Sequence, residues 1–145
     1  MNAAAKDTTN TLLLQPYIFF YGRCEEALEF YKGAIGGTYE FQRISESPMA
    51  GQFPADSRNR VMHGKFTGPG ISFLVSDGRD AKSIDPDEGN ISLALHSEDR
   101  ATGDRVFAGL ANGGKVTMPL KDAFWGGRFG SLVDRFGVEW MVTTP

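Results

Sequence analysis

The chain carries a faint internal repeat in which two helical segments end in the same way. When Phe30 is superposed on Phe107, the alanine and the glycine pair that follow each of them also coincide, namely Ala34 with Ala111 and Gly36-Gly37 with Gly113-Gly114. Glycine adopts the left-handed conformation that ends many helices, so each pair predicts a helix stop. A chain that repeats one pattern in this way is expected to fold as two similar modules.

The residues around each repeat predict a strand, a helix and three further strands, which is a βαβββ module. Helices are predicted over residues 24–34 and 99–111, where apolar residues such as Ala27, Leu28 and Tyr31 recur at helical spacing. Strands are predicted where short apolar runs are bounded by turn-forming residues, namely over residues 17–21, 38–44, 61–67, 71–76, 91–96, 115–120, 130–134 and 139–143. The predicted fold class is therefore α+β.

The length of 145 residues is that of one domain. We expect a flexible N-terminal tail over residues 1–11 and a single domain over residues 12–145, composed of module one (about 12–77), a polar, turn-rich linker (about 78–90) and module two (about 91–145). A second polar stretch, residues 45–60, contains two prolines, Pro48 and Pro54. This stretch is interpreted either as a lid over a site or as a merely mobile loop.

Composition excludes several classes of function. A formal charge of −3 and a pI near 5.3, with scattered basic residues, argue against nucleic-acid binding. The one cysteine, Cys24, cannot form an internal disulfide and fits a reducing compartment. No apolar run approaches the roughly 20 residues of a membrane span, and residues 1–11 lack the apolar middle of a secretory signal. We therefore expect a cytoplasmic protein with no membrane partner.

The C-terminal region concentrates aromatic rings and glycines. It contains Phe124-Trp125-Gly126-Gly127-Arg128-Phe129-Gly130, then Asp134-Arg135-Phe136-Gly137, which predicts a tight hairpin turn, and then Trp140. These residues resemble the C-terminal signature of the vicinal oxygen chelate superfamily, in its PhnB-like and glyoxalase/bleomycin resistance branch. Four earlier segments resemble the same group, so that the resemblance covers nearly the whole chain: residues 15–20, 24–31, 62–66 and 73–77.

The resemblance implies that each module curls into a half-open mixed β-barrel around a cleft, and that the protein is a homodimer whose subunits complete each other's clefts. It also indicates where metal ligands would be expected, because the enzymes of this superfamily hold a divalent cation with inward-facing His and Glu side chains. The corresponding positions fall near Pro16 or Tyr17, Ser92, Met141 and Ser76-Asp77. No shift of one or two residues recovers a His, His, Glu set, so we expect neither a metal nor another cofactor.

Other catalytic groups receive limited support. His63 lies on a predicted strand, where it either projects into the cleft or makes a structural bond, and His96 is interpreted as a solvated residue near a helix start. Cys24 stands where a helix dipole could lower a thiol pKa, but no base is near in sequence, and a lone cysteine is more commonly a small buried apolar group. Asp134 is expected to bond to the backbone of its own turn. Relatives of this group are often labelled demethylubiquinone methyltransferases, yet the chain lacks the glycine-rich strand-to-helix turn that typically binds a methyl donor.

The leading hypothesis is a metal-free protein that binds a small organic molecule in a ring-lined cleft. The candidate ligand-binding residues are six rings, two polar anchors for an anionic or planar ligand and one strand-end acid: Phe20, Phe66, Phe73, Phe124, Trp125 and Trp140; His63 and Arg128; and Asp77. About half of the rings are expected in the core instead. One alternative is a metal-dependent lyase or dioxygenase, and another is an interaction module with a vestigial cleft.

Overall fold

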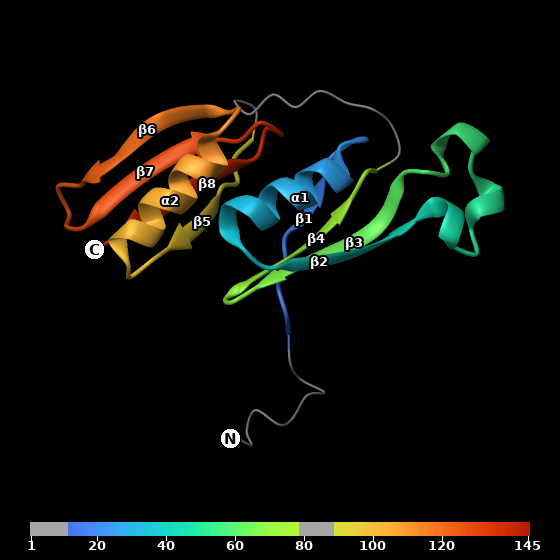
Figure 1. The fold of residues 1–145 in the computed structure, drawn as a ribbon, viewed down its shortest axis with the longest axis horizontal. Coiled ribbons are helices and arrows are strands. Elements are labelled where there is room, and N and C mark those ends of the chain that lie inside the picture. Colours follow the sequence, from blue (N-terminus) through green and yellow to red (C-terminus); the bar gives the residue numbers. More distant parts are fainter. Residues whose placement is uncertain (1–11, 79–88) are drawn as a thin grey trace, which may run out of the picture.

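The structure is a computed structural model that describes residues 12–78 and 89–145. The predicted tail over residues 1–11 and most of the predicted linker lie outside the described residues. The rest forms two four-stranded sheets, each with one helix, and both helices lie on the same side of the sheets (Figure 1). No helix in the described part of the chain has the length and apolar character needed to cross a membrane.

Module one forms the first sheet. Its elements are β1 (Tyr17–Phe19), α1 (Cys24–Ile35), β2 (Thr38–Arg43), β3 (Val61–Gly68) and β4 (Ile71–Ser76). The strand order is β1-β4-β3-β2, in which β1 and β4 are parallel and the other pairs are antiparallel. The stretch between β2 and β3, predicted to be irregular, contains three one-turn 3-10 helices, Ile44–Glu46, Ala50–Gln52 and Ala55–Ser57.

Module two forms the second sheet with the same topology. Its elements are β5 (Leu93–His96), α2 (Arg100–Ala111), β6 (Lys115–Asp122), β7 (Arg128–Val133) and β8 (Glu139–Thr144), and the strand order is β5-β8-β7-β6. The predicted βαβββ repeat is therefore confirmed, with ends displaced by no more than two residues. The first strand was predicted to continue to residue 21, but β1 ends at Phe19. It ends early because Tyr21 and Gly22 adopt positive φ angles of 47° and 103° and turn the chain toward α1.

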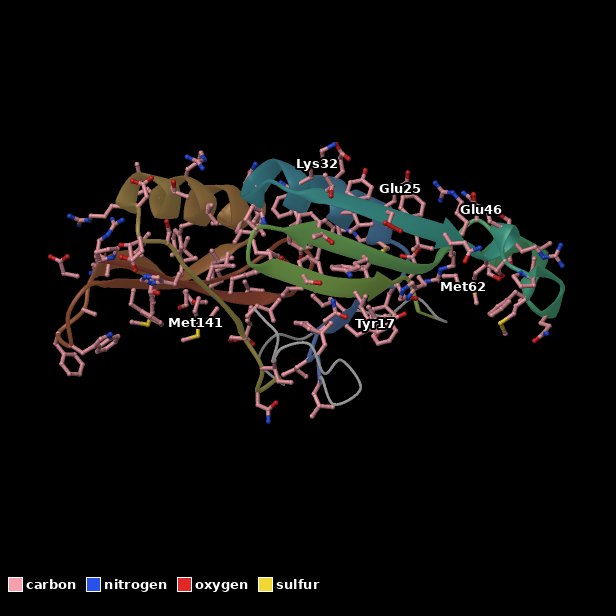
Figure 2. All side chains as sticks on the ribbon, turned by 90° about the horizontal axis from the view of Figure 1, so that it is seen from below. Tyr17, Glu25, Lys32, Glu46, Met62 and Met141 are labelled. Carbon is pink, nitrogen blue, oxygen red and sulfur yellow. The ribbon has the colours of Figure 1, made fainter. Side chains whose placement is uncertain are left out.

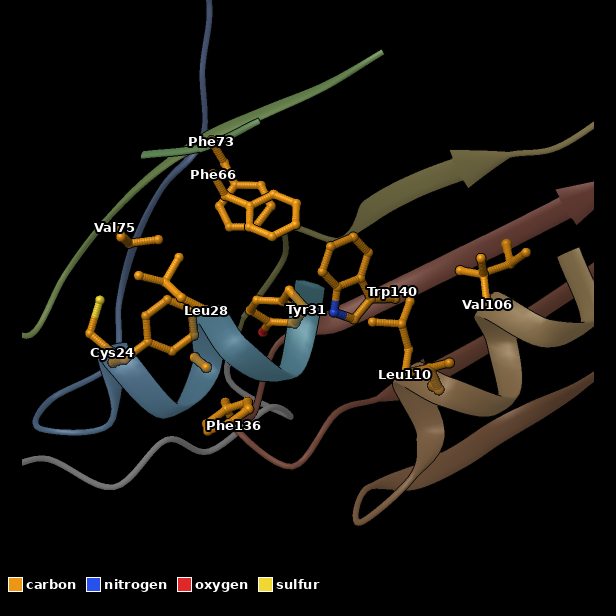
Figure 3. Packing of buried hydrophobic residues seen from close by; sticks show 14 of the residues in the cluster. Cys24, Leu28, Tyr31, Phe66, Phe73, Val75, Val106, Leu110, Phe136 and Trp140 are labelled. Atoms are coloured by element: carbon orange, nitrogen blue, oxygen red, sulfur yellow. The ribbon is translucent and has the colours of Figure 1, made fainter. Parts of the chain in front are cut away.

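The two modules share one hydrophobic core. Tyr31 of α1 lies at the centre, with its ring centroid 5.7 Å from Phe73 of the first sheet and 5.7 Å from Trp140 of the second (Figure 3). The helices approach each other where a Cβ placed on Gly109 would lie 3.2 Å from the Cβ of Ala34. Buried residues of both modules therefore belong to one packed cluster.

Each sheet has one face covered by its helix and one face that the helices leave open. Alternate residues of a strand point to opposite faces, and exposure alternates in this way along β2, β5 and β8. Figure 2 shows both helices above the sheets, while Tyr17 of the first sheet and Met141 of the second point away from them on the lower side. We call these lower surfaces the open faces of the first and second sheets.

Candidate ligand-binding site

The open face of the first sheet combines aromatic, apolar and cationic side chains. Strand register places Tyr17 of β1 beside Leu74 of β4, Leu74 beside Lys65 of β3, and Lys65 beside Glu40 of β2. These four residues form one row across the sheet. His63 and Phe19 lie two residues along their strands from Lys65 and Tyr17, so they belong to the same face.

Two stacked rings on β1 give this face its aromatic character. The rings of Tyr17 and Phe19 have centroids 5.1 Å apart and an interplanar angle of 14°, and the ring of Tyr21 lies 6.3 Å beyond Phe19. Tyr17 is 44% exposed and Phe19 is 45% exposed. Neighbouring rings that are half exposed to solvent leave aromatic surface accessible, and a planar group can stack on it.

His63 is linked to this pair of rings. Its Nδ1 lies 3.1 Å from the hydroxyl oxygen of Tyr17, and the two rings meet edge-on at 5.8 Å. Partial burial is the largest influence on Tyr17 and raises the pKa of its hydroxyl above the usual value. The hydroxyl therefore keeps its proton and can donate it to Nδ1, which leaves the Nε2 nitrogen of His63 as the N–H donor of the imidazole.

Four of the predicted ligand-binding rings lie in the core instead of on an open face. Phe20, Phe66, Phe73 and Trp140 are all buried and pack around Tyr31. The alternation of strand residues explains this placement, because Phe66 is three residues from His63 and therefore points to the opposite face of β3. These rings stabilise the fold and present almost no surface to a ligand.

Asp77 also has a structural place. Its carboxylate is buried at the end of β4, where Oδ1 accepts hydrogen bonds from the backbone N–H groups of Gly22 (2.9 Å) and Cys24 (2.8 Å), and Oδ2 accepts one from Val61 (2.8 Å). The first turn of α1 has no side-chain cap from its own N-cap residue, Arg23. Asp77 supplies the missing acceptor, so it holds the start of α1 against the sheet and does not face a cleft.

The remaining predicted residues belong to the second sheet. Arg128 points to the helix side, where its guanidinium donates to Asp104 Oδ1 (2.8 Å), Thr144 Oγ1 (2.9 Å) and the Arg100 carbonyl (3.2 Å). Phe124 and Trp125 lie in the turn between β6 and β7, 96% and 62% exposed. With Met118 and Phe129 they line a cavity of about 390 Å³. The structure therefore separates these rings from His63, which lies on the first sheet.

The positions at which the resemblance in the sequence implied metal ligands carry side chains that do not suit a cation. Of these positions, Ser92 donates to Glu139 Oε1, and the Asp77 carboxylate accepts from backbone N–H groups. Tyr17 and Met141 lie on the open faces, where register places Leu74 beside Tyr17 and Ala94 beside Met141. Two of these four side chains are aliphatic, one is a thioether and one is a protonated phenol, and hard or borderline cations prefer carboxylate and imidazole. In residues 12–78 and 89–145, no group of three His, Cys, Asp or Glu side chains converges as a metal site would require.

The other candidate groups are occupied elsewhere. His96 is exposed on the second sheet, as its sequence context indicated, and bonds to Thr143 Oγ1 (2.8 Å) and Glu98 Oε2 (2.5 Å). Cys24 is fully buried, and burial, followed by the charge of Asp77, raises the pKa of its thiol far above the usual value. The interpretation of Cys24 as a small buried apolar group is therefore confirmed, and the thiolate that reacts with electrophiles is disfavoured.

The fold is that of the glyoxalase/bleomycin resistance/dioxygenase superfamily. A solved member of that superfamily from Sphaerobacter thermophilus matches with a TM-score of 0.55, at 19% identity, over 94% of this chain and 99% of its own. Protein PA1353 from Pseudomonas aeruginosa matches with a TM-score of 0.79, at 35% identity, over 92% of this chain and 98% of its own.

The family model described as 3-demethylubiquinone-9 3-methyltransferase matches residues 13–143, and the chain belongs to this PhnB-like family. A putative 3-demethylubiquinone-9 3-methyltransferase, PhnB protein, from Bacillus cereus has a TM-score of 0.69 and 28% identity, over 92% of this chain and its full length. Protein YjdN of Escherichia coli K12 is 28% identical over 138 residues, which are 89% of this chain and 92% of that protein. The resemblance found in the sequence is thus confirmed.

Proposed function

We propose that this protein binds a small planar organic molecule, without a metal ion, on the open face of the first sheet. The observation that carries the proposal is the half-exposed stack of Tyr17 and Phe19, with His63 bonded to its edge. An aromatic surface with a few polar groups beside it is the usual composition of a small-molecule site. The unsuitable side chains at the metal positions favour binding or metal-independent chemistry over a metal-dependent lyase or dioxygenase.

The methyl transfer named in the family description finds no matching site among the described residues. A methyl donor is typically bound by a glycine-rich turn between a parallel strand and a helix in a doubly wound sheet. Here residues 20–23 join β1 to α1 with a single glycine, Gly22, and residues 97–99 join β5 to α2 with none. The sheets are mixed and carry helices on one face only. Our proposal for this chain is therefore ligand binding and not methyl transfer.

The first test is a titration with naphthalene derivatives followed by protein NMR or calorimetry. We expect at least one derivative to bind to the wild-type protein, and Phe19→Ala to weaken that binding about tenfold, because a stacked ring pair contributes about 0.5–1.5 kcal/mol beyond its buried area. Tyr39→Ala is the matched control, since it removes a partly exposed ring from the helix-side face of the same sheet. If no derivative binds, or if both variants weaken binding equally, the site is not where we place it.

A second copy of the chain is the proposed cover for this site. Both open faces point to the same side of the molecule, so one chain cannot fold its own second sheet over its first (Figure 2). The open face of the second sheet offers apolar contacts in Met118, Phe129 and Met141, of which Met118 is 52% exposed. The resemblance to bleomycin-resistance proteins implies the same arrangement, a homodimer with shared clefts.

Analytical ultracentrifugation tests this arrangement. We expect twice the mass of one chain, and Met118→Asp should raise the dimer dissociation constant at least tenfold, because a charge would be buried at an apolar contact. Val116→Asp is the control, since Val116 is similarly exposed on β6 but belongs to the other face of that strand, opposite Leu132. A wild-type protein that stays monomeric would remove the shared cleft while leaving the open face itself available for ligand.

A further inference from the structure

We infer that the ligand carries an anionic group, such as a carboxylate or phenolate on an aromatic ring, and that Lys65 and His63 recognise this group. The inference rests on the proposed function, because it concerns the same open face. It adds the chemical class of the ligand and the residues that select it. It also replaces Arg128 as the cationic anchor, since the Arg128 guanidinium is fully engaged between β7 and α2.

The geometry of the row across the sheet defines the length of the site. Leu74 lies between Tyr17 and Lys65 in this row, so the Cα atoms of Tyr17 and Lys65 are two strand spacings apart. At the usual 4.8 Å between neighbouring strands, this distance is about 10 Å. Leu74 is partly buried and provides an apolar floor between them. A flat ring can therefore lie over Leu74 against the Tyr17 side while a substituent on that ring reaches Lys65.

The charges of this face favour an anion at that substituent. In the described part of the chain, Lys65 has no ion pair and no hydrogen bond from its ammonium group, and His63 bonds only through Nδ1 to Tyr17. The open-face residues of β1 and β4 include no acid. The one carboxylate in the row belongs to Glu40 on β2, beyond Lys65 and on the far side from the rings. A ligand on the rings thus meets the cation before it meets the carboxylate.

His63 supplies a second donor beside the ammonium. When the Tyr17 hydroxyl donates to Nδ1, the neutral imidazole carries its proton on Nε2, which has no partner in the described residues. Lys65 and His63 are two residues apart on β3 and point to the same face, so their N–H groups can converge on the two oxygens of one carboxylate.

Three probes with the same ring system test the inference: naphthalene-2-carboxylate, 2-naphthylmethanol and 2-naphthylmethylamine. Calorimetry at one fixed pH should show the carboxylate binding about tenfold tighter than the alcohol and the ammonium binding weakest. Lys65→Gln should bring the carboxylate and alcohol affinities together. Lys32→Gln, which neutralises a lysine of α1 on the helix side, should keep the wild-type preference. Added salt should narrow the preference in the wild-type protein.

The outcomes distinguish this inference from the proposed function. Binding of none of the three probes would contradict the proposed function itself. Binding of all three with equal affinity, or a preference for the ammonium, would leave the proposed site intact and overturn the anionic ligand. A preference for the carboxylate that survives Lys65→Gln and His63→Gln together would also overturn the inference, because the selecting charge would then lie elsewhere.

Discussion

Replacing Asp134 by alanine is expected to lower the free energy of unfolding by about 3–5 kcal/mol, a large part of the roughly 5–15 kcal/mol that stabilises a domain of this kind. The carboxylate is buried and accepts four hydrogen bonds. Oδ2 accepts from the Tyr31 hydroxyl (2.6 Å) and Trp140 Nε1 (2.9 Å), and Oδ1 accepts from the backbone N–H groups of Phe136 (2.8 Å) and Val138 (3.1 Å). The alanine variant leaves all four donors in the core without an acceptor, which is the costly form of a broken network.

Urea unfolding monitored by tryptophan fluorescence measures this loss. Glu26→Ala is the matched control, because it removes an exposed carboxylate that pairs with the exposed Arg23, and exposed pairs contribute about 1 kcal/mol or less. Asp134→Asn is expected to fall between the two, since the amide keeps one oxygen for the backbone donors but directs an N–H group toward Tyr31 and Trp140. A loss of less than about 1 kcal/mol in Asp134→Ala would contradict the account of this network.

The Asp134 network gives a structural role to part of the C-terminal signature. Tyr31 belongs to α1 in module one, whereas Asp134 and Trp140 belong to the β7–β8 hairpin in module two. Two further contacts join the same parts, with the Arg23 guanidinium 4.5 Å from the Phe136 ring centroid and the Arg135 guanidinium 4.4 Å from that of Phe30. The part of the motif from Asp134 to Trp140 therefore fastens the two modules together.

The fold could be predicted from the sequence because its signals are local. The glycine pairs mark where the helices end, and Gly36 and Gly37 have φ angles of 84° and 115° that other residues adopt with strain. The turn at Asp134 was also predicted correctly, and Asp134 Oδ1 accepts from the backbone of that turn. What the sequence could not give is the hydrogen bond from Tyr31, because it joins residues that are far apart in the chain.

The candidate site was predicted less well, because counting rings does not say which face of a sheet they occupy. Alternation along β3 separates His63 from Phe66, and alternation along β1 separates Tyr17 and Phe19 from Phe20, so these signals were present in the sequence. One feature that affects the facing of residues on β3 could not be predicted from the sequence. A β-bulge shifts the register between Gln42 and Arg43, so that Val61 and His63 have consecutive partners on β2 and the alternation of β3 is interrupted at its start.

The second large effect is expected for Asp77→Ala, which should destabilise the protein by about 3 kcal/mol while leaving the affinity of the folded protein for naphthalene probes unchanged. Three backbone N–H groups lose their acceptor; one belongs to Cys24, the first residue of α1, and another to Gly22 in the turn that leads into it. Asp99→Ala is the natural comparison, because Asp99 caps α2 through Thr102 but is exposed, where a lost cap costs about 1 kcal/mol.

The pair of measurements on Asp77→Ala separates a structural role from a ligand-binding one. Asp77 was a candidate for the cleft because it ends a strand. If its carboxylate contacted the ligand, Asp77→Ala would lower the affinity for the probes with little change in the unfolding midpoint. The structure predicts the reverse, since the carboxylate is buried beneath the turn that leads into α1. Lost affinity with unchanged stability would place the ligand at the end of β4 and would move the proposed site away from Tyr17 and Phe19.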